Sequence, residues 1–141
     1  AIQLWDTVHL HCLQSIQIED ISFSRVSFFA QVSRTRVWIA CGKEIIIFST
    51  DLEVITRFKA HERKINQLLP KPEGIWSCSD DGTIAIWKHD GTLDKRRKVH
   101  MKEVNCLLGL GNFVCSGSSD SSVVLWDSMS ACPLQELEGY Q

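Results

Sequence analysis

Residues 60–87, AHERKINQLLPKPEGIWSCSDDGTIAIW, decide the fold, because the chain repeats their pattern 39 residues later. Residues 99–126 read VHMKEVNCLLGLGNFVCSGSSDSSVVLW and align with the first copy without a gap. Eight of the 28 aligned positions are identical. A period of this size is the signature of a repeat architecture. The identical polar and aromatic pairs are His61 and His100, Ser77 and Ser116, Asp81 and Asp120, and Trp87 and Trp126.

Weaker copies lie upstream of these two. The run Val37-Trp38-Ile39-Ala40-Cys41 is typical of a strand, and Phe48 stands 39 residues before Trp87. Trp5 precedes Phe48 by 43 residues. We therefore expect a single repeat domain over residues 1–141, with a partial unit at 1–20 and repeats at about 21–59, 60–98 and 99–138.

Each unit is predicted to consist of short antiparallel strands. The apolar runs are four to seven residues long, rich in Val, Ile, Trp and Phe, and bounded by Gly, Asp and Ser. Asp81-Gly82, between two such runs, is a strong signal for a tight hairpin. No stretch has a helical period with caps. The sequence predicts an all-β fold of four-stranded antiparallel meanders.

The composition is that of a globular protein, with 44% hydrophobic and 23% charged residues in a chain of 141. The formal net charge of −2 gives no global reason to expect binding to nucleic acid or to an anionic membrane. Six cysteines lie far apart without a Cys-x-x-Cys pair, and we expect them to be small buried residues in a reducing compartment.

The repeats resemble the WD-repeat β-propeller family. The resemblance rests on a small residue followed by His, then Ser-x-Ser-x-Asp-Gly, then a strand that ends in Trp-Asp. Here these pieces are Ala60-His61, the run from Ser77 to Gly82, and Trp87-Lys88, and they recur up to Trp126-Asp127. The resemblance implies propeller blades. It is weaker in the first full repeat, where the hairpin at Gly42-Lys43 is short and lacks Asp, and where Ser22 replaces His.

The resemblance also implies a hydrogen-bonded set in each of the two clear repeats. Buried indole N–H groups need acceptors and buried carboxylates need donors, so such a set satisfies itself and holds its hairpin against the neighbouring blade. The implied sets are His61, Ser77, Asp81 and Trp87, and then His100, Ser116, Asp120 and Trp126.

The same residue types allow a hydrolase triad as an alternative interpretation. We reject it because the set occurs twice at one period, as scaffold residues do, whereas a catalytic site occurs once. No glycine-rich phosphate loop, paired-carboxylate site or nucleophile elbow is found in the sequence. We expect no enzyme activity and no cofactor.

The repeats amount to about three and a half blades, whereas propellers typically close with four to eight. We expect an incomplete ring, completed either by the rest of a longer chain or by a second copy, and we favour the longer chain. Tyr140 follows Gly139 where the family would place another Gly-His pair, which fits the start of a further repeat.

Propellers of this type bind proteins or peptides through loops at one rim, and the resemblance assigns seven residues to that rim. The loops before the inner strands, together with the hairpin turns, carry Arg25, Arg63, Lys64, Asp80, Lys102, Glu103 and Ser119. Their mixed charges suit an oppositely patterned protein partner. An ordinary solvated surface explains any single one of them equally well.

Two further motifs each allow a functional and a structural interpretation. The run Lys95-Arg96-Arg97-Lys98 suits phosphoinositide or acidic-surface binding, or else an edge strand protected by cations, and we favour the edge strand. No aromatic residues interleave with it, so we expect no nucleic-acid binding. His9 and His11 could share a strand face, but no second ligand cluster accompanies them and we expect no metal site.

These features predict a non-catalytic protein-interaction scaffold or regulatory module within a larger cytoplasmic protein. The resemblance implies parents such as small-GTPase regulators and trafficking or signalling proteins. The alternative is a phosphoinositide or acidic-surface binding module that uses residues 95–98.

Overall fold

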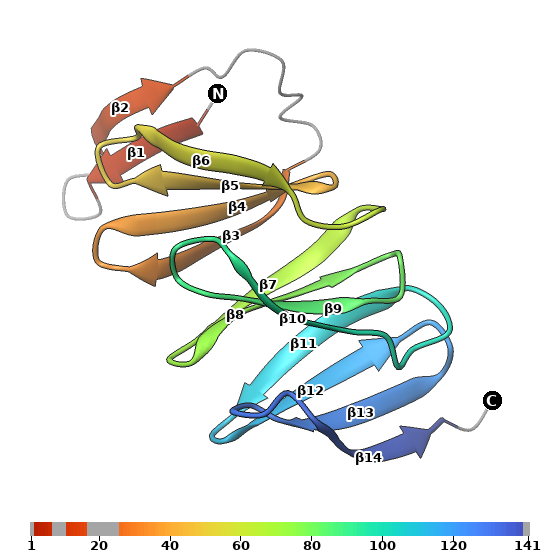
Figure 1. Cartoon of the computed structure of the whole chain (residues 1–141). Helices are drawn as coiled ribbons and strands as arrows, with labels where there is room; N and C mark the ends of the chain where they lie inside the picture. Colours follow the sequence, from red (N-terminus) through yellow and green to blue (C-terminus); the bar gives the residue numbers. More distant parts are fainter. Residues whose placement is uncertain (1, 7–10, 17–25, 140–141) are drawn as a thin grey trace.

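The computed structural model describes residues 2–6, 11–16 and 26–139, and all regular structure in these ranges is β-strand. Twelve of the strands form three four-stranded antiparallel sheets, each a meander of consecutive strands (Figure 1). The first sheet holds β3 (Val26–Ser33), β4 (Arg36–Cys41), β5 (Glu44–Ser49) and β6 (Val54–Lys59). The second holds β7 (Ile65–Lys71), β8 (Gly74–Ser79), β9 (Ile84–Trp87) and β10 (Leu93–Arg97). The third holds β11 (Val104–Leu110), β12 (Phe113–Ser118), β13 (Ser122–Asp127) and β14 (Pro133–Glu138).

A two-stranded hairpin precedes the three sheets. Its strands are β1 (Ile2–Asp6) and β2 (His11–Ile16), which pair antiparallel. The prediction of an all-β fold built from four-stranded antiparallel blades is confirmed, and the described sheets do not close into a ring (Figure 1).

The hairpin predicted at Asp81-Gly82 joins β8 to β9. Gly82 has a φ of +83°, in the left-handed region that glycine adopts without a steric penalty. A Cβ at this position would lie 3.2 Å from the carbonyl oxygens of both His100 and Lys102. The turn therefore packs directly against the loop that leads into the third sheet, and its glycine serves both the turn and the contact.

The sheets stack face to face because their strands are apolar on both faces. Trp38 of β4 is fully buried between the first and second sheets, in a cluster with Ile65 and Trp87. Trp76 of β8 is fully buried between the second and third sheets, in a cluster that includes Trp126. Both tryptophans therefore pack between neighbouring sheets. The innermost strands β3, β7 and β11 contact one another in that order.

The far face of the third sheet lacks such a cover within the described residues. Ile84 and Ile86 of β9 are 1% and 3% exposed where the third sheet covers them. Val123 occupies the position of Ile84 one repeat later and is 44% exposed, and Leu137 beside it on β14 is 58% exposed. The third sheet thus ends the stack with an apolar face turned to solvent.

The cysteines only partly fit their predicted burial. Cys41 and Cys78 are buried, but Cys106 and Cys132 are exposed and Cys115 is half-buried. The prediction was wrong for Cys106 and Cys132. Cys106 follows Val104 across an irregularity in the pairing of β11 with β12, which breaks the simple alternation of buried and exposed positions. No described residue belongs to a helix that is long and apolar enough to cross a bilayer.

Candidate interaction site at the rim

The second sheet contains a hydrogen-bonded chain from an indole to an imidazole. The Trp87 Nε1–H group donates to Ser77 Oγ at 2.8 Å, and Ser77 Oγ lies 2.7 Å from His61 Nε2. Trp87 comes from β9, Ser77 from β8, and His61 from the loop before β7. Ser77 is fully buried and His61 is 2% exposed, so the chain fastens this loop to the middle of the sheet in a region without solvent.

The chain continues from His61 into the β8–β9 turn. His61 Nδ1 lies 3.1 Å from Asp81 Oδ2 and 2.9 Å from Thr83 Oγ1. The backbone N–H of Glu62 donates to Asp81 Oδ2 at 3.0 Å, and that of Thr83 donates to Asp81 Oδ1 at 2.8 Å. The carboxylate therefore joins the tip of the hairpin to the loop before β7.

These contacts assign the imidazole tautomer. Ser77 Oγ accepts the indole N–H, so its own proton is free to be donated to His61 Nε2. Nε2 is then the acceptor, and Nδ1 carries the proton that is shared with Asp81 and Thr83. In this arrangement each polar side-chain atom from Trp87 through Ser77 and His61 to Asp81 has a hydrogen-bond partner, as buried polar groups require.

The third sheet repeats the arrangement atom for atom. Trp126 Nε1–H donates to Ser116 Oγ at 2.8 Å, and Ser116 Oγ lies 2.7 Å from His100 Nε2. His100 Nδ1 lies 3.3 Å from Asp120 Oδ2 and 2.9 Å from Ser122 Oγ. The structure therefore brings together both sets of four residues that the sequence singled out.

Thr83 and Ser122 were missed in the sequence analysis, although each hydroxyl bridges its aspartate and histidine. Thr83 Oγ1–H donates to Asp81 Oδ1 at 2.5 Å, and Ser122 Oγ–H donates to Asp120 Oδ1. The two residues are 39 positions apart, so a hydroxyl at a fixed place in the repeat was the available signal. The signal is weak because the hydroxyl belongs to threonine in one repeat and to serine in the other.

Both aspartates are held in the charged form. Burial alone would raise the pKa of Asp81, but the hydrogen bonds from His61, Thr83 and the Glu62 backbone outweigh it and hold the pKa well below its usual range. Burial likewise opposes the charge on Asp120. The hydrogen bonds from Ser122 and the Met101 backbone again prevail, so the pKa of Asp120 is also lowered.

The lowered pKa values predict a loss of stability in acid. A carboxyl whose folded pKa lies below its unfolded value of about 3.9 stabilises the protein above that pH, and this stabilisation is lost as the pH falls toward the folded pKa. We expect Asp81→Asn to lower the free energy of unfolding at pH 7 by about 1–3 kcal/mol. The difference in the free energy of unfolding between this variant and the wild type should become smaller below about pH 4.

Urea unfolding at pH 7, 5 and 3 measures this gap. The control is Asp94→Asn, which removes the same charge from an exposed position on β10 and should change the free energy of unfolding by less than about 0.5 kcal/mol. A constant gap between Asp81→Asn and the wild type across this range would contradict the assignment of Asp81 as a structural anion.

The first sheet lacks the serine–tryptophan pair. Strand pairing places Ile39 where the second sheet has Ser77, and Phe48 where it has Trp87. This agrees with the weaker family pattern of the first full repeat. The position of Ser22, which replaces the histidine, lies outside the described residues. The indole N–H groups of Trp38 and Trp76 are buried without a hydrogen-bond partner, so these two residues contribute through packing.

Five of the seven predicted partner-binding residues line a single cleft of about 530 Å³, which we call the rim cleft. It lies between the β8–β9 turn and the loop before β11. The five are Arg63, Asp80, Lys102, Glu103 and Ser119, and the cleft is completed by Asp81 and Met101.

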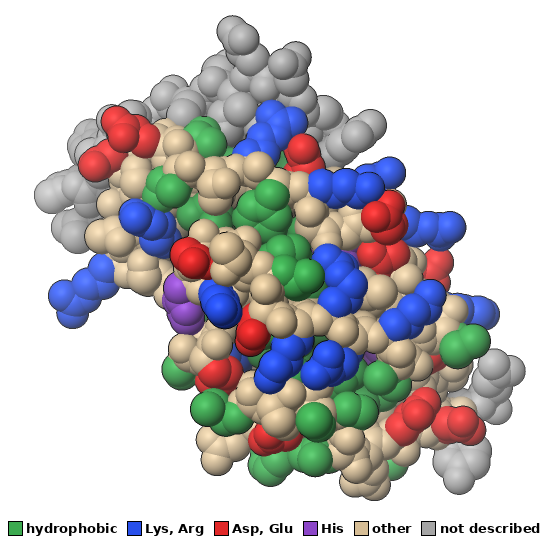
Figure 2. Space-filling model, viewed as in Figure 1, with side chains coloured by type: hydrophobic (Ala, Val, Ile, Leu, Met, Phe, Trp, Pro, Cys, Tyr) green, Lys and Arg blue, Asp and Glu red, His purple; other side chains and the backbone are tan. Residues whose placement is uncertain are grey.

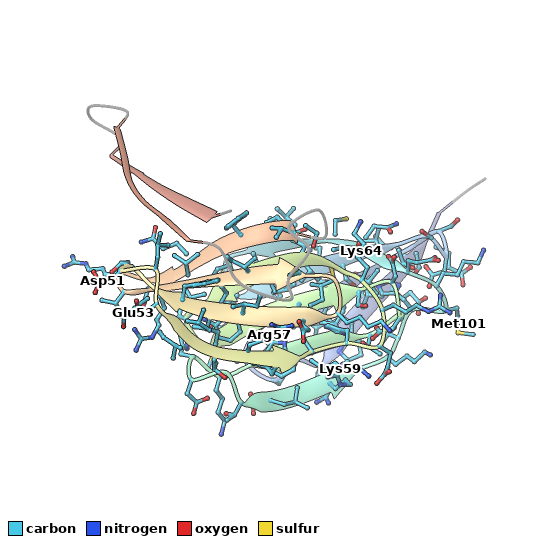
Figure 3. All side chains as sticks on the ribbon, turned by 90° about the horizontal axis from the view of Figure 1, so that it is seen from above. Asp51, Glu53, Arg57, Lys59, Lys64 and Met101 are labelled. Carbon is cyan, nitrogen blue, oxygen red and sulfur yellow. The ribbon has the colours of Figure 1, made fainter. Side chains whose placement is uncertain are left out.

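Of the other two predicted residues, only Lys64 is described by the structure. Lys64 lies at the same end of the sheets as Met101, as Figure 3 shows, but is not part of the cleft wall. Arg25 lies outside the described residues. Met101 was missed in the sequence analysis. It is 85% exposed, a surface position for which the repeat pattern gives no signal.

Two recurring asparagines hold the hairpin turns beside the cleft. Asn66 Nδ2 donates to Asp80 Oδ1 and to the backbone oxygen of Val104, both at 2.8 Å. Asn105 Nδ2 donates to Ser119 Oγ at 3.0 Å. Asn66 thus ties its own turn to the inner strand of the next sheet, which gives the repeated asparagine a structural role that the sequence did not explain.

The basic run at residues 95–98 is divided between two sides of β10. Lys95 Nζ donates to the backbone oxygen of Ser130 at 3.1 Å, and Arg97 Nε donates to that of Ala131 at 3.2 Å. Both partners belong to the β13–β14 connection of the third sheet. Arg96 instead donates to the backbone oxygen of Ala60 at 2.7 Å, on the side of the first sheet. The described residues include no group of His, Cys, Asp and Glu that could hold a metal, and His9 lies outside them.

Comparison with known proteins gives a consistent result. The family model for the WD domain, G-beta repeat, matches residues 52–88 and 91–127, just over half of the chain. The solved WD40 β-propeller domain of Doa1 is similar over 80% of this chain and 40% of its own, with a TM-score of 0.72 and 26% identity. The WD40 repeats of RRP9 match 89% of this chain and 41% of theirs, with a TM-score of 0.76 and 17% identity.

Two other similarities concern chains of very different length. The computationally designed protein Ika4 matches 90% of this chain and 79% of its own, with a TM-score of 0.77 and 20% identity. A probable serine/threonine-protein kinase, pats1 of Dictyostelium discoideum, is 38% identical over 52 residues. That match covers 36% of this chain and only 2% of the kinase.

Proposed function

This chain belongs to the WD-repeat family, and from that membership we propose that it is a non-catalytic part of a propeller that binds another protein or peptide at the rim cleft. WD40 propeller domains generally serve as protein-interaction scaffolds. The observation that carries the proposal is the convergence of Arg63, Asp80, Lys102, Glu103 and Ser119 on one cleft, built from loops of two adjacent blades.

The geometry of the cleft suits a peptide of mixed charge. Its wall carries two cations, Arg63 and Lys102, and the carboxylates of Asp80 and Glu103. Asp80 is held in place by Asn66, which lowers the cost of ordering the wall when a partner binds. Met101 adds an apolar side chain at the mouth, where a partner could cover it.

The proposal assigns no chemistry to the His–Ser–Asp sets. WD40 propellers are typically non-catalytic. Ser77 and Ser116 are fully buried, and each hydroxyl oxygen already accepts an indole N–H. A nucleophile must reach its substrate, and a hydroxyl enclosed in this way offers no approach. We further propose that this part of a propeller is a regulatory arm of a small-GTPase regulator or of a trafficking or signalling protein, and that the protein is located in the cytoplasm.

Charge reversal at the rim cleft tests the proposed site. We expect Arg63→Glu combined with Lys102→Glu to weaken partner binding at least tenfold, because like charges would then face each other across the interface. The matched control is Asp51→Lys combined with Glu53→Lys. Figure 3 shows Asp51 and Glu53 at the opposite end of the sheets from Lys64 and Met101.

The measurement is quantitative co-purification from cells that produce each full-length variant, followed by affinity measurement with the recovered partner. Binding that survives the rim reversal but not the reversal at Asp51 and Glu53 would place the site at the other end of the sheets. Binding that survives both reversals would also contradict the assignment.

A further inference from the structure

A second cleft, which shares only Asp81 with the rim cleft, lies on the side of β10 that faces the loop between the first and second sheets. It has a volume of about 460 Å³, and we call it the basic cleft. Its wall includes the cations Lys59, Arg96 and Lys98, opposed by the carboxylates of Glu62 and Asp81, a balance of +1. Lysine and arginine side chains gather across the middle of the face drawn in Figure 2, where Figure 1 places β10.

The guanidinium of Arg96 is fixed at the wall of this cleft. Its Nη2 donates to the backbone oxygen of Ala60 at 2.7 Å, and its central carbon lies 5.9 Å from the centre of the Trp87 ring. These contacts order the side chain before any ligand arrives, so little conformational entropy is lost on binding.

One edge of this guanidinium is poorly satisfied. Arg96 Nη1 lies 3.3 Å from His61 Nδ1, but that nitrogen carries the proton shared with Asp81 and Thr83 and cannot accept another. The remaining contact of Nη1, to Thr83 Oγ1, is long at 3.4 Å. The group therefore offers N–H donors to an acceptor that enters the cleft.

The neighbouring sheets show that this positive charge is peculiar to the second sheet. In the first sheet Arg57 occupies the position of Arg96, and Glu44 neutralises it through an ion pair of 2.9 Å. The second sheet has Thr83 where the first has Glu44. Within the described residues, Arg96 and Lys98 form no ion pair. In the third sheet the same strand register places Glu136, which pairs with Val124, at the position of Arg96, and Glu138 at that of Lys98.

The acidic residues of the wall are already engaged. Asp81 accepts hydrogen bonds on both carboxylate oxygens, and Glu62 is paired with Lys59 at 2.9 Å. Neither is positioned to neutralise Arg96. The electrostatic potential in the cleft therefore favours an anion. Arg96 can donate two parallel hydrogen bonds to it from its planar guanidinium, and Lys98 can contribute a localised positive charge.

We propose that the basic cleft binds a phosphate monoester presented by a phosphorylated serine or threonine of a partner protein. A phosphate carries up to two charges and three acceptor oxygens, which match a fixed guanidinium beside a lysine. A planar anionic membrane is the poorer fit, because Lys95 and Arg97 are turned to carbonyl groups of the third sheet and leave only half of the run on this side. The site does not depend on the rim cleft.

A blocked phosphothreonine, N-acetyl-O-phosphothreonine amide, is the probe, and its ³¹P signal is titrated with the full chain. We expect saturable binding that the unphosphorylated probe lacks. Arg96→Gln, which removes the positive charge and the guanidinium group, should weaken binding at least tenfold. The matched control Lys95→Gln removes one charge from the same strand and should change the affinity less than twofold.

Arg96→Lys distinguishes a loss of phosphate recognition from a loss of folding, because it retains the positive charge and loses the planar guanidinium donors. With thermal unfolding unchanged, its affinity should fall about three- to tenfold. The charge reversal at Arg63 and Lys102 should change the phosphate affinity less than twofold. The proposal for the basic cleft and that for the rim cleft can therefore be disproved independently.

Three results would overturn the proposal. The first is the absence of saturable binding to the wild type, and the second is an equal loss of affinity in Arg96→Gln and Lys95→Gln. The third is binding to phosphatidylcholine vesicles with 5% phosphatidylinositol phosphate that both variants weaken alike, with no binding of the soluble probe. This last result would identify a membrane surface instead.

Discussion

Replacing Trp126 by alanine is expected to lower the free energy of unfolding by about 3–5 kcal/mol. Trp126 has no exposed surface, and its ring lies edge-on to Trp76 with 6.1 Å between the ring centres. It fills the interface between the second and third sheets, so its loss leaves a cavity that the flanking strands cannot close. Since single domains are stable by only about 5–15 kcal/mol, this one change should bring the protein close to unfolding.

Urea unfolding followed by circular dichroism measures the loss. Met129→Ala is the control, because Met129 lies in the turn between β13 and β14 of the same blade and is 69% exposed. It should change stability by less than about 0.5 kcal/mol. A loss of less than about 1 kcal/mol in Trp126→Ala would mean that the two sheets do not depend on this contact for their stability.

The second large effect is expected from Ser116→Ala, at about 2–4 kcal/mol. Removing this hydroxyl leaves two buried groups without partners, the indole N–H of Trp126 and the Nε2 atom of His100. An unsatisfied buried polar group costs more than the bond itself contributes, because it has lost water without compensation.

Ser119→Ala is the matched control for this variant. Ser119 is exposed and accepts one hydrogen bond, from Asn105, so its loss should cost less than about 1 kcal/mol. Equal losses in the two variants would contradict the role assigned to Ser116. They would show that burial of the hydroxyl chain adds nothing beyond an ordinary surface hydrogen bond.

In the first sheet both members of the serine–tryptophan pair are naturally replaced by apolar residues. Ile39 and Phe48 stand where the other sheets have serine and tryptophan, and both are 1% exposed. Replacing both partners of a buried hydrogen bond by apolar groups leaves no stranded atom. This explains how the blade keeps its four strands after losing the pair, and why the pair is not a requirement for the strand pattern.

The sequence predicts contacts within a repeat better than contacts between repeats. The turn at Asp81-Gly82 and the pairing of Ser77 with Trp87 follow from the 39-residue period, because their geometry lies within one sheet. Ser121 shows that even a turn within one repeat is not always predictable from the sequence. It adopts a φ of 70° at the position of Gly82, so the third sheet makes the same turn without the glycine signal.

Contacts that cross from sheet to sheet depend on how the blades are rotated against one another. The bond from Asn66 to Val104 and that from Arg96 to Ala60 join residues 38 and 36 positions apart. The sequence shows these side chains on predicted strands, but not which of them reach the neighbouring sheet. The rim cleft was accessible to prediction because its loops recur, whereas the basic cleft depends on a single unpaired arginine.

A double-mutant cycle between Ser116→Ala and Trp126→Phe tests most directly whether the indole, the hydroxyl and the imidazole act as one structural unit. Trp126→Phe keeps an aromatic ring between the sheets and removes the N–H donor together with the five-membered ring that carries it. If the unit exists, the two changes are less harmful together than the sum of their separate effects, with a coupling free energy of about 1 kcal/mol or more. Strictly additive losses would show that the hydroxyl and the indole stabilise the third sheet independently, and would contradict this account.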